Sequence, residues 1–160
     1  MSSTIEIRRA EPDDAAEIVR VLHAAFVEFE PLYTPQGFAA TVLDAEQVLR
    51  RMTEGPAWIA LLGDEVVGSV AAIEKNESVY VRGMAVVPAA RGSGAGGRLL
   101  ASAEAWALER KHTRIYLSTT PFLLSAIRLY EGNGYKRVDT KLHDLFGTPL
   151  FTMEKSLPTK

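Results

Sequence analysis

The residues with the clearest chemical potential form a glycine-rich segment, Arg91-Gly92-Ser93-Gly94-Ala95-Gly96-Gly97. It follows an apolar run closed by Pro88 and precedes a helix-forming apolar run from Leu99. Glycines let a ligand approach the backbone closely because no Cβ stands in the way. A helix N-terminus offers free N–H groups and about half a positive charge to an anion. With Arg91 as an added cation, the segment predicts an anion-binding loop rather than a merely flexible turn.

The kind of anion depends on where the loop lies in the chain. Gly92-x-Gly94-x-x-Gly97 matches the dinucleotide-binding fingerprint, but a lone match is weak. That fold requires the turn after its first strand and an acidic residue about 20 positions further on. Here three or four expected strands precede the loop, and the next strand ends in Ser118-Thr119-Thr120 without a carboxylate. The phosphate loop of nucleotide hydrolases is excluded because no Gly-Lys-Ser/Thr occurs.

Composition narrows the class of protein. The chain has 160 residues, a net charge of −2 and no cysteine, so we expect one domain over residues 1–160. The absence of cysteine excludes a disulfide scaffold, a zinc-thiolate site and a cysteine nucleophile, and we expect no metal. The balanced charge argues against a nucleic acid or a membrane as the main partner. No signal peptide or membrane-spanning run is visible, so we expect a cytoplasmic protein.

The elements that must position the loop can be read from hydrophobic periodicity. Helices are expected from Pro12 to about residue 27, over 36–51, from 99 to about 111, and over 124–132. Strands are expected over 4–8, 57–62, 66–73, 79–87, 114–119, 135–142 and 150–157. This order predicts an α/β (α+β) fold with four helices layered on one mixed sheet of about seven strands.

Two segments resemble a known family. Residues 86–100, VVPAARGSGAGGRLL, resemble the main motif of the GNAT superfamily of N-acetyltransferases, Val-x-Pro-x-x-Arg/Gln-x-x-Gly-x-Gly/Ala followed by a helix. Residues 126–135, AIRLYEGNGY, are similar to its second motif, Ala-x-x-Leu-Tyr-Glu-x-x-Gly-Phe/Tyr. Residues 7–18 and 151–157 loosely fit the family's first and last elements. The likeness covers nearly the whole chain in order, and the two internal motifs are jointly specific.

The resemblance implies a mostly antiparallel sheet with a splayed central strand pair, and acetyl-CoA as the acyl donor. The strand residues Met84, Ala85 and Val86 would offer backbone groups to the pantetheine arm. The pyrophosphate would be held by Arg91 and by the amides of Gly92, Ser93, Gly94, Ala95, Gly96 and Gly97. Ser125 would touch the coenzyme. Tyr130 matches the family's tyrosine near the thioester sulfur, where it would protonate the departing thiolate; the alternative is a core tyrosine with a satisfied hydroxyl.

The same resemblance implies direct attack of an amine on the thioester in a ternary complex, with the Val86 N–H polarising the carbonyl. The group that prepares the amine is open, because many relatives have a glutamate near the position of Tyr80. The candidates are Glu28, which we assign as a catalytic residue, Glu30, Tyr80, His143 and a water relay.

The acceptor site is expected in the less regular parts of the chain. Glu28 and Glu30 would suit a cationic amine. The aromatic candidates for its walls are Phe26, Phe29, Tyr33, Phe38, Phe122 and Phe146, with His143. We therefore expect an acetyl-CoA:amine N-acetyltransferase that acts on a small-molecule or peptide amine, with a homodimer as a further expectation. The alternative is a non-catalytic acyl-CoA-binding regulatory module.

Overall fold

The computed structural model describes residues 4–138 and 143–158, in which five α-helices pack on one sheet of eight strands. The strands are β1 (Ile5–Arg9), β2 (Ala57–Leu62), β3 (Glu65–Lys75), β4 (Ser78–Val86), β5 (Arg114–Thr119), β6 (Lys136–Arg137), β7 (His143–Leu145) and β8 (Thr148–Ser156). Their order in the sheet is β1-β2-β3-β4-β5-β8-β6, and β7 pairs with β8. All neighbours are antiparallel except β4 and β5. The predicted mixed, mostly antiparallel fold is confirmed.

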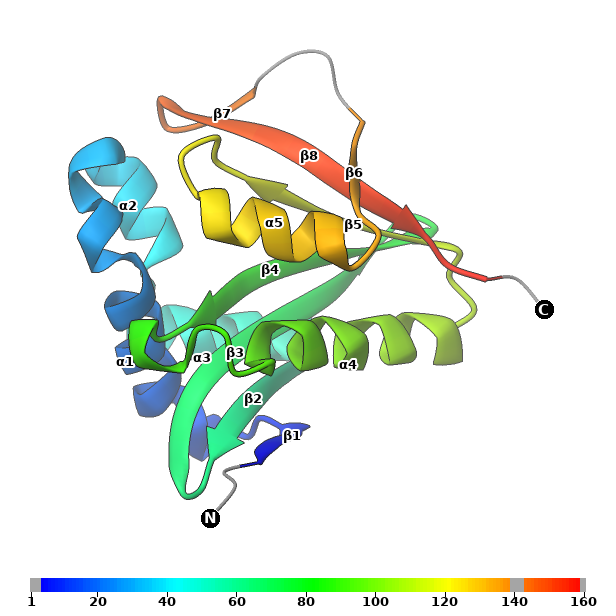
Figure 1. Cartoon of the computed structure of the whole chain (residues 1–160), viewed down its shortest axis with the longest axis horizontal. Helices are drawn as coiled ribbons and strands as arrows, with labels where there is room; N and C mark the ends of the chain where they lie inside the picture. The colour runs from blue at the N-terminus through cyan, green and yellow to red at the C-terminus, as the bar shows by residue number, and fades with distance from the viewer. Residues whose placement is uncertain (1–3, 139–142, 159–160) are drawn as a thin grey trace.

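The helices cover the two faces of the sheet unequally. They are α1 (Ala15–Phe26), α2 (Pro35–Thr41), α3 (Ala45–Glu54), α4 (Ala95–Glu109) and α5 (Leu124–Gly132). Figure 1 shows α4 and α5 in front of the sheet and α1 with α3 behind it. A strand with helices on both sides must be apolar on both faces, whereas a strand covered on one face alternates. The helices thus divide the sheet into a doubly covered half and a singly covered half.

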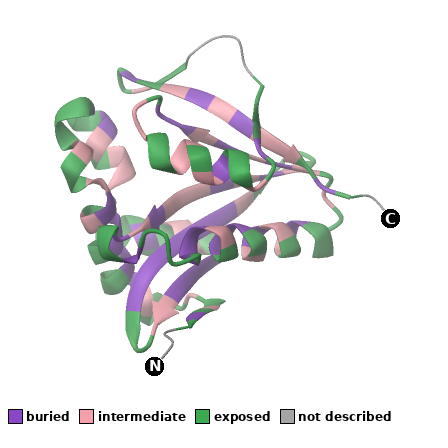
Figure 2. Ribbon diagram, in the orientation of Figure 1, coloured by how far each residue is buried: buried purple, intermediate pink, exposed green. Residues whose placement is uncertain are grey.

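Burial along the strands follows this division. Every residue of β3 from Val66 to Ala72 is buried, and Figure 2 shows the band of burial running along β2 and β3. In β5 burial alternates, with Ile115, Leu117 and Thr119 buried and the residues between them partly exposed. The main hydrophobic core therefore lies between α1, β2–β4 and α4.

The parallel pair β4–β5 is joined over only part of its length. Three residue pairs connect the two strands, and the last is Val81 with Leu117. Beyond it β4 continues to Val86 and β5 to Thr119 without pairing to each other. The register of β3 against β4 shifts at this point, and Gly83 has a φ of 65°, the left-handed backbone that glycine adopts at bulges. The predicted splayed strand pair is thus present.

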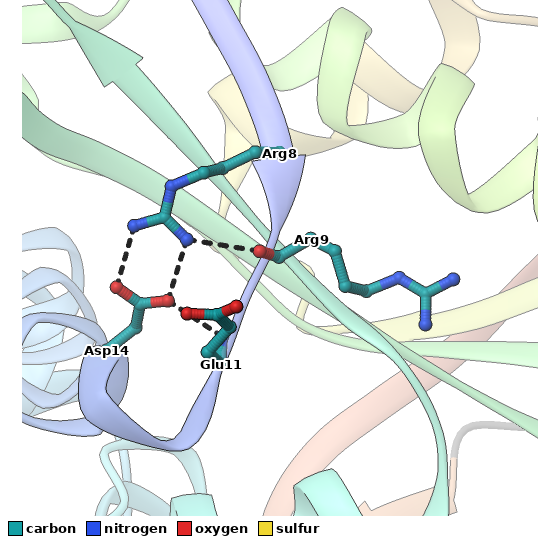
Figure 3. A network of polar contacts seen from close by, with 4 residues as sticks. All are labelled: Arg8, Arg9, Glu11 and Asp14. Carbon is teal, nitrogen blue, oxygen red and sulfur yellow. Dashed lines mark hydrogen bonds and ion pairs between the residues drawn. The ribbon is translucent and has the colours of Figure 1, made fainter.

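A polar network fixes the turn from β1 into α1 (Figure 3). Both guanidinium nitrogens Nη1 and Nη2 of Arg8 donate to the Asp14 carboxylate at 2.9 Å, and the Glu11 N–H donates to the same carboxylate at 2.7 Å. The Arg8 side chain holds the pKa of Asp14 below its usual range. Arg8 also donates to the carbonyl of Arg9. This network sets the direction in which α1 leaves the sheet.

Two predicted elements differ in the structure. The single helix expected over 36–51 is two helices, because Asp44 caps α3 by accepting from the Gln47 N–H at 2.9 Å while the Gln47 side chain accepts from the Asp44 N–H. This capping box in the sequence indicates a new helix start at Asp44, which our prediction did not include. In the expected strand over 135–142, only Lys136–Arg137 is a strand among the described residues, and 139–142 lie outside them. The last hairpin turns at Phe146 and Gly147, both with positive φ.

Candidate active site

The predicted anion loop lies between β4 and α4, as its sequence indicates. Gly92 and Gly94 have φ values of 83° and 92°, which a side chain would strain by roughly 1–2 kcal/mol. Gly94 is the N-cap of α4, and because it has no side chain it cannot cap the first N–H groups of the helix. The amides of Gly96 and Gly97 lie in the first turn, where no intrahelical acceptor is available. The loop therefore presents N–H groups at the positive end of a 15-residue helix.

Gly96 is required for a close approach between two helices. A Cβ at this residue would lie 2.7 Å from Cδ2 of Leu129 on α5, while Cβ atoms at Gly92 and Gly94 would meet nothing within 4 Å. The glycines of the loop thus serve different purposes. Gly92 and Gly94 set the backbone path, and Gly96 lets α4 and α5 come together at the base of the loop.

A cavity of about 460 Å³ opens along this loop. Its walls come from α1, the splayed part of β4, the loop and α5, and its volume suits a coenzyme-sized ligand. The predicted binding residues that line it are Met84, Ala85, Val86, Arg91, Gly92, Gly94, Ala95, Gly96, Gly97, Ser125 and Tyr130. The fold therefore brings together residues more than 40 positions apart in the sequence. Of the predicted set, Ser93 and Glu28 are not among the lining residues, and Ser93 instead accepts from the Ala95 N–H at 3.3 Å.

Glu28 has a specific partner at the rim of this cavity. Its carboxylate lies 2.7 Å from Nη1 of Arg91, whose Nη2 donates to the Ala25 carbonyl at 3.1 Å. Both side chains are partly exposed. The carboxylate thus holds the loop arginine against the end of α1. Its role as a catalytic base stays a prediction.

The Val86 N–H points into the gap between the strands. The Val87 N–H donates to the Val67 carbonyl of β3 at 2.9 Å. Successive amides of a strand point to opposite edges, so the amide of Val86 is directed away from β3. On that edge, β5 pairs with β4 only as far as Val81. The donor that we predicted to polarise a thioester carbonyl therefore faces open space.

Tyr130 lies where the first cavity meets a second one. Its side chain is 5% exposed and lines both, and within the described residues no hydrogen bond to its hydroxyl is found. Burial raises the pKa of Tyr130 well above the ordinary value, so the hydroxyl is a protonated donor at neutral pH. The neighbouring Tyr135, whose ring centroid is 6.1 Å away, instead donates to Glu104 Oε2 at 2.9 Å.

The second cavity has a volume of about 290 Å³ and lies on the other side of Tyr130. It shares Phe26, Met84, Leu123 and Ala126 with the first. Of the aromatic residues predicted for the acceptor, Phe26 and Tyr33 line it, whereas Phe29 lines the first cavity. Phe38 and Phe122 do not line it but pack edge-on against Tyr33, with centroids 5.9 and 5.0 Å away.

Phe146 and His143, also predicted for the acceptor site, do not line the second cavity. Phe146 is 65% exposed in the turn before β8. The His143 Nε2 lies 3.4 Å from the Ser118 hydroxyl, which does line the cavity. Tyr80, one of the candidates for the group that prepares the amine, does line the second cavity.

Two charged side chains that line the second cavity were not predicted from the sequence. They are Arg51 of α3 and Arg82 of β4, whereas no Asp or Glu lines either cavity among the described residues. Their residue type was a weak signal for a binding site, because arginines in a helix and in a strand are usually exposed to solvent. In the same described residues, no group of three His, Asp or Glu side chains could hold a metal ion, and no helix is long and apolar enough to cross a membrane.

Comparisons with known proteins place the chain in a family. The model of the Acetyltransferase (GNAT) family matches residues 18–135. The uncharacterized N-acetyltransferase YjgM of Escherichia coli is 31% identical over 142 residues, which cover 85% of this chain and 84% of that protein. The N-acetylaspartate synthetase of Xenopus tropicalis is 33% identical over 104 residues, 64% of this chain but 38% of that protein.

A solved structure agrees on the fold. The PaiA N-acetyltransferase of Thermoplasma acidophilum, in complex with coenzyme A, superposes with a TM-score of 0.81 at 19% identity and covers 98% of this chain and 99% of that one. The family model and the shared fold define the class of the protein as an acetyltransferase. The chain belongs to the GNAT acetyltransferase family.

Proposed function

We propose that the protein is an N-acetyltransferase that moves the acetyl group of acetyl-CoA directly to an amine acceptor in a ternary complex. The observation that carries this proposal is the meeting of two cavities at Tyr130. One is lined by the anion loop and suits the coenzyme, and the other suits the acceptor. Residues 1–160 would form one such domain, and the cytoplasmic location and the homodimer remain predictions from the sequence and the resemblance.

The coenzyme would be bound by backbone groups. Its pyrophosphate fits the first-turn amides of α4 and the Arg91 guanidinium, because both supply positive charge without filling the space that the glycines leave. The pantetheine arm would follow the unpaired edge of β4 from Met84 to Val86. This places the thioester carbonyl near the Val86 N–H, which would stabilise the oxyanion of the tetrahedral intermediate.

The reaction itself would need no covalent enzyme intermediate. The amine nitrogen forms a bond to the acetyl carbon, and the carbon–sulfur bond breaks when the intermediate collapses. Tyr130 would donate its proton to the departing thiolate and regain one from solvent or from the amine. A raised tyrosine pKa keeps this donor protonated.

The proton on the incoming ammonium must also be removed. With no carboxylate lining the second cavity among the described residues, a water relay is the simplest route.

The test combines binding and turnover. We expect acetyl-CoA to bind in calorimetry, and release of free thiol when amines are added. Tight binding of acetyl-CoA with no turnover on a broad panel of amines would favour the non-catalytic regulatory module. Absence of coenzyme binding would refute both.

A further inference from the structure

The second cavity carries an unbalanced positive charge. Arg51 and Arg82 enter it from α3 and β4, and the other polar side chains that line it bear neutral hydroxyls. These hydroxyls belong to Tyr33, Thr41, Tyr80, Ser118, Thr119, Thr120 and Tyr130. A cavity of this kind is poorly suited to a cationic group such as a polyamine, and it suits an anion.

Arg51 is partly buried and lines the second cavity from α3. It is only partly exposed, and its Nη1 lies 3.0 Å from the position that a Cβ on Gly83 would take. No ion pair of Arg51 is found within residues 4–138 and 143–158. Burial and the nearby Arg82 guanidinium lower the pKa of Arg51 to about 10. An anion bound here would therefore relieve an existing electrostatic penalty.

Arg82 is only partly neutralised. One of its Nη nitrogens pairs with Glu54, yet its Nε is buried and has no hydrogen-bond partner among the described residues. The Arg82 side chain is 18% exposed. Two guanidinium groups against one carboxylate leave a single net positive charge, which one further carboxylate would balance.

We infer that the acceptor is a small amine that also carries a carboxylate, such as a free amino acid, and that Arg51 and Arg82 bind this carboxylate. The inference rests on the proposed transferase activity and names its substrate class. With the carboxylate at the arginine end, the amine would extend toward Tyr130 and the thioester. The modest volume of about 290 Å³ is at the small end for a ligand pocket and fits a molecule of this size.

The test compares amines that differ only in the carboxylate. Acetyl-CoA-dependent thiol release is measured with amino acids and with the amines obtained by removing their carboxylates, such as L-phenylalanine against phenethylamine. We expect kcat/KM to be at least tenfold higher for the best amino acid than for its partner amine. The set includes dicarboxylic amino acids and polyamines.

The variant Arg51→Gln removes the proposed ligand, and Arg50→Gln is the matched control. Arg50 is the next residue of α3, but it is exposed and pairs with Glu46 at 3.4 Å. We expect Arg51→Gln to raise KM for the amino acid roughly 10- to 100-fold, the effect of losing a charged hydrogen bond, with little change in KM for acetyl-CoA. The partner amine should be affected less than threefold, and Arg50→Gln should change neither substrate by more than twofold.

The outcomes separate the two proposals. Equal use of amines with and without a carboxylate, or equal effects of Arg51→Gln and Arg50→Gln, would overturn the carboxylate site and leave the transferase intact. If no amine is acetylated, the proposed transferase activity is refuted. Calorimetry of the coenzyme-loaded protein with the same amino acids and with succinate then tests whether the second cavity binds carboxylates. Binding to the wild type that is lost in Arg51→Gln would support the carboxylate site. Absence of binding to the wild type would overturn the carboxylate site.

Discussion

Replacing Tyr130 by phenylalanine tests the proposed chemistry with little disturbance to the fold. The side chain is 5% exposed, and no hydrogen bond to its hydroxyl is found among the described residues. Removing an oxygen without a protein partner leaves no orphaned group behind, so we expect the free energy of unfolding to change by less than about 1 kcal/mol. The ring, which packs near Tyr135, is retained.

The expected loss is in turnover. A positioned general acid contributes roughly 10²- to 10⁴-fold, so kcat of Tyr130→Phe should fall within that range while the affinity for acetyl-CoA changes less than threefold. Because burial raises the pKa of Tyr130, the wild-type hydroxyl stays protonated at least to about pH 10. The wild-type rate should therefore show no alkaline decline from this residue below that pH.

Tyr135→Phe is the matched control, for which we expect a loss of stability without a loss of turnover. It removes a hydroxyl that donates to Glu104 at 2.9 Å, and a hydrogen bond to a charged group contributes about 1.5–3 kcal/mol. For a chain of this size, Tm should fall by roughly 3–12 °C, with kcat nearly unchanged. Thiol release and thermal denaturation of both variants complete the test. A kcat of Tyr130→Phe within threefold of wild type would refute the general-acid role.

Three further substitutions test the site. Gly96→Val should push Leu129 away, lower stability by about 1–3 kcal/mol and weaken acetyl-CoA binding; unchanged Tm and affinity would contradict the close approach of α4 and α5. Glu28→Gln should raise KM for acetyl-CoA through loss of the Arg91 ion pair, whereas a kcat loss beyond about 100-fold at unchanged affinity would identify Glu28 as the base. Gly83→Ala should cost about 1–2 kcal/mol because φ is 65° there; urea denaturation measures it, and a neutral result would show that the bulge relaxes.

Much of the fold was predictable from local patterns. The glycine loop and the helix after it followed from residue spacing, because each signal lies within a few residues. The split between α2 and α3 was missed because a continuous helical periodicity outweighed the Asp44–Gln47 capping box. The short β6 was overextended because alternation alone does not say where a neighbouring strand stops pairing.

The candidate site was predictable only where the family motifs reach. The loop residues and Tyr130 lie in those motifs, and the structure places them around one cavity. Arg51 and Arg82 lie in no motif, and they are 31 positions apart. The fold brings the Arg51 guanidinium of α3 close to Gly83 of β4, and so both guanidinium groups reach the second cavity. Long-range packing of this kind leaves no periodic trace in a single sequence.

The short junction between β4 and β5 has a consequence for engineering. Only three residue pairs connect these strands. Selection for stability alone would favour pairing of β4 with β5 along their whole length. Such a closed variant, without the bulge at Gly83, would gain ladder hydrogen bonds and lose the opening into which both cavities lead. Directed evolution for thermostability in this region should therefore be run under selection for activity, because here the two goals oppose each other.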